Sequence, residues 1–380
     1  MSVKTHISYL DSIRGLAALT VICEHYVIAY GLPCETPVCQ QILDYSPLHM
    51  WWDGSAAVSM FFVLSGLVLS LKYFREGHHP DMQHFDLNSY LISRLCRIWL
   101  PYLVILVISF ALYLYIVEQS VLTTALPATK WITNMWPGNP LTVFDALRES
   151  FLLNLPSVIV LLPQSWTLNI ELVLSLLLPV GLLLAERGTT WLVGFTLLAV
   201  SLLDVSLFLL HFLLGLLIAR HYSKIADYLT RKPWQRRLML IIGLVLYNSA
   251  SIFYNAANET LIWLGSGLGA GLILMFASGS VRTQLILSYP LLRQMGKVSY
   301  SAYLTHMAIL IGLTPYFLNG LEIFTSERSP LWFGGWLLTV LMIQAVSQLS
   351  YHWLEIPSIS LGRRVTDVFK RPVKSQAIEK

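Results

Sequence analysis

Charge is scarce in this sequence. Only 12% of its 380 residues are Asp, Glu, Lys or Arg, whereas 56% are hydrophobic. Soluble domains contain about 25% charged residues, so the composition excludes an ordinary water-soluble domain. It predicts an all-α protein that is integral to the membrane and crosses the bilayer many times.

Cysteines and metal-binding motifs are also few. The chain has four cysteines and contains no C-x-x-C or H-E-x-x-H spacing, which predicts that it holds no metal ion. Cys34 and Cys39 lie in a predicted outer loop, where a disulfide is permitted. Whether they are bridged is left open by the sequence.

Runs of apolar residues predict a polytopic helical bundle of about ten transmembrane helices. The predicted spans are 10–31, 56–73, 97–117, 166–186, 190–204, 206–220, 236–254, 261–278, 298–318 and 331–353. The apolar stretch 150–163 is interrupted by Pro156, and we interpret it as a re-entrant or interfacial piece.

Lysine and arginine gather in alternate loops. The 220–237 loop carries six of them, whereas the 32–55 loop has none. By the positive-inside rule, this alternation predicts that both termini are cytoplasmic. The net charge of +4 then follows from topology and requires no nucleic-acid partner. We expect one membrane domain over 1–357 and a basic cytoplasmic tail over 358–380.

Two polar residues of the first span fall on one helical face. Arg14 and His25 are eleven positions apart, so a helix returns them to nearly the same direction, roughly 16 Å apart along its axis. A charge at the centre of a membrane helix costs about 2.5–3.5 kcal/mol on insertion scales. We therefore expect both side chains to line one wall of a shared cavity. An interfacial histidine satisfied by water or a carbonyl is the alternative.

Three further polar groups interrupt the apolar spans. Arg94 and Arg97 are neighbours on one face at the cytoplasmic boundary; they are typical flanking charges, but also suit a phosphate clamp. The segment "QSWTLNIE" gathers Trp166, Asn169 and Glu171, a set suited to sugar hydroxyls. The segment "GKVSYSAYLTH" places Tyr303 and His306 three residues apart on one helical face. Such a face serves either helix packing or catalysis.

These segments together resemble the acyltransferase 3 family of membrane-bound O-acyltransferases. The resemblance runs through "LDSIRGLAALTVICEHY", "FFVLSGLVLS", "RLCRIWLPY", "LLNL" with "QSWTLNIE", "GKVSYSAYLTH" and "HWLEIP". It implies a ten-span fold and transfer of acyl groups from coenzyme A to extracytoplasmic carbohydrate. One departure is Ser59, because many members have an acidic residue at the matching position. A multi-pass protein of the bacterial inner membrane is expected.

The resemblance also implies roles for the polar residues. Arg14, Arg94 and Arg97 would bind the phosphates of acetyl-CoA or another acyl-CoA, which is a co-substrate. His25 would be the general base, supported by Glu171 and Arg14. Trp166, Asn169, Tyr303 and His306 would bind substrate.

The sequence leaves alternatives open for both the mechanism and the class of protein. A covalent acyl-histidine relay is the rival of direct transfer. A transporter of a polar or lipid-linked solute is the rival of the enzyme, although the sequence shows none of the paired repeats typical of transporters. The acyl chain, the carbohydrate acceptor and the oligomeric state stay open.

Overall fold

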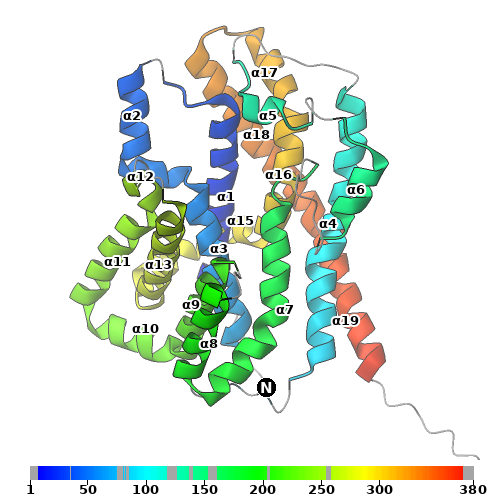
Figure 1. Cartoon of the computed structure of the whole chain (residues 1–380). Helices are drawn as coiled ribbons and strands as arrows, with labels where there is room; N and C mark the ends of the chain where they lie inside the picture. Colours follow the sequence, from blue (N-terminus) through cyan, green and yellow to red (C-terminus); the bar gives the residue numbers. More distant parts are fainter. Residues whose placement is uncertain are drawn as a thin grey trace, which may run out of the picture.

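The computed structural model describes residues 7–34, 36–74, 80, 82, 85–117, 126–136, 140–152, 161–202, 206–253 and 258–370, and in these ranges every regular element is a helix. The longest are α1 (Ser8–Tyr30), α3 (Gly54–Leu71), α4 (Leu87–Val117), α7 (Ser165–Arg187), α13 (Glu259–Ser278) and α18 (Arg328–Ser350). The chain is thus the all-α membrane protein that its composition predicts (Figure 1).

Each of the ten apolar stretches forms helix, but ten spans are not confirmed. Within the ranges given above, six helices are long and apolar enough to cross a membrane, or up to eight when two bent pairs are counted as single spans. The pairs are α9 (Phe208–Arg220) with α10 (Tyr222–Arg231), bent by 72°, and α16 (Ser299–Gly312) with α17 (Thr314–Glu322), bent by 49°.

Length explains the difference. The helix α8 (Thr189–Leu202) has 14 residues, and α11 (Pro233–Tyr247) has 15 before α12 (Ser249–Phe253) begins. At 1.5 Å per residue such helices reach about 20 Å, short of a hydrocarbon core of about 30 Å. Of the expected re-entrant stretch 150–163, Pro156 and its neighbours lie outside the described residues.

Glycines allow two pairs of helices to pack with their backbones in contact. A Cβ on Gly215 of α9 would lie 2.6 Å from the backbone nitrogen of Leu67 in α3. A Cβ on Gly15 of α1 would lie 2.6 Å from the backbone nitrogen of Gly296, in α15 (Pro290–Lys297). Small residues of this kind permit the close approach that stabilises helix pairs in membranes. The contact of α1 with α15 also forms part of the candidate site.

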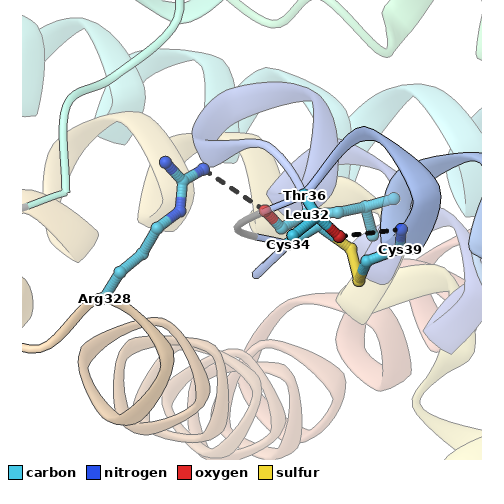
Figure 2. The surroundings of a disulfide bond; sticks show 5 residues. All are labelled: Leu32, Cys34, Thr36, Cys39 and Arg328. Carbon is cyan, nitrogen blue, oxygen red and sulfur yellow. Dashed lines mark hydrogen bonds between the residues drawn. A yellow bond between two sulfur atoms is a disulfide. The ribbon is translucent and has the colours of Figure 1, made fainter.

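The carboxyl end of α1 is fixed by contacts from distant parts of the chain. α1 ends at Gly31, whose φ of 71° suits glycine. The carbonyl of Gly31 accepts a hydrogen bond from Trp332 Nε1 at 2.6 Å, and that of Leu32 accepts one from Arg328 at 3.2 Å. Next to these contacts, Cys34 and Cys39 form a disulfide, so the pairing left open by the sequence is made (Figure 2).

Several short helices gather at that same end of the molecule. They are α2 (Pro37–Tyr45), α5 (Lys130–Thr133) and α6 (Val143–Ser150), together with α17 (Figure 1). The α5 helix is joined to α1 through Thr129, whose amide donates to the carbonyl of Ala29 at 2.8 Å. This contact brings the neighbouring Trp131 close to the first helix.

The predicted tail begins as helix. A π-helical turn, η3 (Tyr351–Glu355), joins α18 to α19 (Ile356–Lys370), and α19 packs along α4. The boundary expected at residue 357 therefore falls inside continuous helix, and residues 371–380 lie outside the described residues. The cytoplasmic position of both termini stays a prediction.

Candidate active site

The candidate site is a cavity of about 310 Å³ enclosed by helices from both halves of the chain. Its walls come from α1, α3, α4, α7, α15 and α16, with η3 and α19. Its volume lies at the lower end of the range usual for ligand pockets, about 300–1,000 Å³. The charged residues that line it are Asp11, Arg14, Arg94, Arg97, Glu171, Lys297 and Glu355.

The three arginines predicted to bind phosphate line this cavity together. Arg14 comes from α1, and Arg94 and Arg97 come from one face of α4. Arg14 lies 4.0 Å from Asp11, and it is close enough to Arg97 for the two charges to repel. The Nε of Arg94 is buried and has no hydrogen-bond partner in the described part of the chain. An unpaired buried donor among like charges favours an anionic ligand.

Lys297 adds a fourth cation, which the sequence reasoning took only as a topological charge. It is the last residue of α15, the helix whose Gly296 packs on α1.

Glu355 was also not predicted, although an acidic residue just after an apolar span could have indicated it. It lies in the π-helical turn and accepts a hydrogen bond from Ser301 at 3.1 Å. Single π-helical turns often occur at functional sites.

Glu171 lies among the arginines. Its carboxylate accepts a hydrogen bond from Ser65 at 3.3 Å, and it interacts electrostatically with Arg14 and Arg94. His25, the partner expected for it, is not among its contacts in the described residues. The two residues do not meet because α7 directs Glu171 toward Ser65 of α3 and Arg94 of α4. His25 lies closer to the carboxyl end of α1.

Tyr303 is a lining residue that also contacts one of the predicted histidines. Its hydroxyl makes a hydrogen bond of 2.6 Å with the hydroxyl of Thr167, and its ring meets the ring of Phe61 edge to face, with centroids 5.6 Å apart. All three residues line the cavity. His25 and His306 do not line it, so the expected sharing of one cavity wall by Arg14 and His25 is not observed.

The two histidines contact each other, and His306 also contacts Tyr303. The ring of Tyr303 lies 5.4 Å from that of His306 between centroids, and His306 Nε2 lies 3.1 Å from His25 Nδ1. His306 Nδ1 lies 2.6 Å from the backbone oxygen of Tyr303. His306 is only 1% exposed, whereas His25 keeps part of its surface.

Two further contacts hold the His25 ring. Trp131 of α5 stacks on it, with centroids 5.6 Å apart and planes 19° apart. The backbone of Val21, one turn earlier in α1, also hydrogen-bonds the ring. No sequence pattern points to Trp131, because it stands in a long predicted loop about 100 residues after the first helix.

Trp166 and Asn169 do not line the cavity. Trp166 is 37% exposed and packs against Phe208 at 5.8 Å between ring centroids. The amide of Asn169 donates to the backbone oxygen of Leu152, which connects α7 to the segment after α6. Their predicted role in binding substrate stays a prediction.

The described residues can also be searched for the side chains that usually bind metal ions. No group of three or more His, Cys, Asp or Glu side chains in those ranges is arranged to hold a metal ion. The cavity itself offers guanidinium, ammonium, carboxylate and hydroxyl groups, and the imidazole pair of His25 and His306 lies outside its lining.

Comparison with known proteins identifies the family of this chain. No curated protein and no solved structure matches the chain. The family model Acyl_transf_3, described as an acyltransferase domain, matches residues 7–351, which is nearly the whole chain. The chain therefore belongs to the acyltransferase 3 family, and it is a membrane acyltransferase.

Proposed function

We propose that this enzyme transfers an acyl group, acetyl in the first instance, from cytoplasmic acyl-CoA to a hydroxyl of a surface or periplasmic carbohydrate. The cavity with its four cations is the observation that carries this proposal. Coenzyme A is a polyanion with its thioester at the end of a long neutral arm. Guanidinium groups are well suited to its phosphates, and Arg94 has a buried donor without a partner in the described residues.

The arm of coenzyme A would extend from the cations toward Tyr303. This direction leads from charged walls at Arg14 and Arg94 to aromatic and hydroxyl groups at Phe61 and Thr167. Tyr303 contacts both Thr167 of the cavity wall and His306, so its ring would have to turn aside before the thioester meets His25. Breaking the hydrogen bond between its hydroxyl and Thr167 would cost about 1 kcal/mol, which binding energy can offset.

His25 would act as the general base. Its Nε2 takes the proton of the acceptor hydroxyl while that oxygen attacks the thioester carbonyl carbon. The new C–O bond forms as the C–S bond breaks, and the proton passes to the departing thiolate to give free coenzyme A. A histidine suits this work because its ordinary pKa lies close to neutral pH.

The acceptor would approach from the opposite side to acyl-CoA. His25 lies toward the end of α1 that carries the Cys34–Cys39 disulfide and the α5 helix. His25 is partly exposed and the ring of Trp131 stacks on it, so an aromatic ring would lie near the bound acceptor. Aromatic faces of this kind also pack against sugar rings. An inner bacterial membrane, with donor and acceptor on opposite sides, is the setting that we propose.

The test uses inside-out membrane vesicles from cells that express the chain. Labelled acetyl-CoA is added, and both free coenzyme A and labelled glycan are measured over time. We expect release of coenzyme A with label on glycan, and at least a 100-fold loss of both in His25→Ala, because general-base catalysis contributes about 10²–10⁴-fold. His352→Ala, at an exposed histidine in η3, is the matched control.

Three outcomes would contradict the proposal in whole or in part. Full activity of His25→Ala would remove the general base from the mechanism. Label that crosses the membrane without bond formation would indicate transport instead. Label trapped on the protein before acceptor is present would replace direct transfer with an acyl-histidine intermediate.

A further inference from the structure

We infer that His306 is a positioning residue for His25, which fixes the tautomer that places the basic nitrogen toward the substrate. The inference rests on the proposed role of His25 as general base. The sequence assigned His306 to substrate binding and assigned the support of His25 to Glu171. In the structure, His306 contacts His25 directly, while Glu171 hydrogen-bonds Ser65.

The argument starts from a backbone oxygen. A carbonyl accepts hydrogen bonds and cannot donate them. His306 Nδ1 lies 2.6 Å from the carbonyl oxygen of Tyr303, so Nδ1 must carry a proton. Because His306 is 1% exposed and a buried charge is costly, its ring is neutral. A neutral imidazole has one proton, so its Nε2 is an acceptor.

The tautomer of His25 then follows. His306 Nε2 faces His25 Nδ1 at 3.1 Å, and two bare nitrogens would repel. His25 Nδ1 must therefore donate. In neutral His25 the proton is thus on Nδ1, which leaves a lone pair on Nε2.

The result is a directed chain of hydrogen bonds. His25 donates to His306, and His306 donates to the carbonyl of Tyr303. When His25 Nε2 takes the proton of the acceptor hydroxyl, both its nitrogens are protonated, and the charge is stabilised by the acceptor on His306. In serine hydrolases a buried aspartate holds the catalytic histidine in the right tautomer. Here a second neutral histidine would perform that function without adding a buried negative charge.

The geometry holds the ring from three sides. Trp131 stacks on one face of His25, His306 contacts Nδ1, and the α1 backbone lies behind the ring. His25 is also the more exposed of the two histidines. This arrangement separates the two roles: His25 meets the substrate, and His306 acts through His25.

The experiment compares two substitutions of His306 with His25→Ala. A glutamine can place an acceptor oxygen near the position of Nε2, whereas a leucine of similar size cannot. We expect His306→Leu to lower kcat about 100-fold with the KM for acetyl-CoA within twofold, and His306→Gln to recover activity to within about tenfold of the unchanged protein. Thermal unfolding in detergent checks that each variant is folded.

A second measurement does not depend on activity. The ¹⁵N NMR spectrum of histidine-labelled protein in bilayers distinguishes Nδ1-protonated from Nε2-protonated rings, and the signal of His25 is assigned as the one lost in His25→Ala. We expect an Nδ1-protonated His25 in the unchanged protein and in His306→Gln, and loss of that preference in His306→Leu.

The outcomes separate the two proposals. Unchanged kcat in His306→Leu, or an Nε2-protonated His25 in the unchanged protein, would overturn the role of His306 while leaving His25 as the base. Full activity of His25→Ala would overturn the proposed function and the inference with it. If His306→Gln is as inactive as His306→Leu while both are folded, His306 does more than accept a hydrogen bond, and the inference is wrong.

Discussion

The carboxylate of Glu171 in α7 accepts a hydrogen bond from Ser65 of α3 at 3.3 Å, inside the cavity that Arg14 and Arg94 also line. This contact places a negative charge within the group of cations that we propose for phosphate binding. Glu171 therefore offsets the mutual repulsion of the arginines. It would compete with an incoming phosphate for the same guanidinium groups.

The first prediction concerns this competition. Glu171→Gln keeps the shape and the contact with Ser65 but removes the charge, so we expect the KM for acetyl-CoA to fall severalfold with kcat nearly unchanged. Steady-state kinetics in membranes measures both. If Glu171 instead supported the His25 imidazolium, as the sequence suggested, kcat would drop by about 100-fold and KM would stay constant.

The second prediction concerns the arginines. Arg94→Gln removes a buried donor, and hydrogen bonds to charged groups contribute about 1.5–3 kcal/mol. We therefore expect the KM for acetyl-CoA to rise at least tenfold, with little change in kcat. The control is Arg293→Gln, at an exposed arginine of α15 outside the cavity. Equal KM values for the two variants would remove Arg94 from the donor site.

Much of the fold could be predicted because apolar runs and helices coincide. All ten predicted stretches are helical, and the bounds of α1 and α7 differ from the expected ones by a few residues. Hydropathy could not predict whether each of these helices is long enough to cross the bilayer. The breaks after α9 and α16 bend the chain by 72° and 49°, and such bends depend on tertiary packing.

Helical spacing predicts that Arg94 and Arg97 share a face of α4, and both line the cavity. The same reasoning failed for Arg14 and His25, because Arg14 lines the cavity and His25 does not. The meeting of His25 and His306 joins residues 281 positions apart, and no local periodicity contains that information. The contact of Trp131 with His25 likewise depends on how α5 folds back over α1.

The third prediction concerns membrane orientation. The Cys34–Cys39 disulfide requires an oxidising compartment, so we expect that loop to face outward. In sealed right-side-out vesicles, a membrane-impermeant maleimide should label these cysteines only after reduction. Cys96, beside Arg97 on α4, is the internal control and should be labelled only in inside-out vesicles. Labelling of Cys96 from the outside would reverse the predicted topology.

The last prediction concerns the close packing of α3 and α9. A methyl group on Gly215 would lie 2.6 Å from the backbone nitrogen of Leu67, and a backbone atom within a helix cannot move aside cheaply. Overpacking of this kind costs about 1–3 kcal/mol, so Gly215→Ala should lower the Tm in detergent by several degrees. The matched control is Gly194→Ala in α8, where a Cβ meets nothing within 4 Å. Because alanine favours helix over glycine by up to about 1 kcal/mol, this control should keep or raise the Tm. Equal losses of Tm in both variants would mean that α3 and α9 are not in backbone contact, and the wall of the cavity that α3 forms would have to be placed differently.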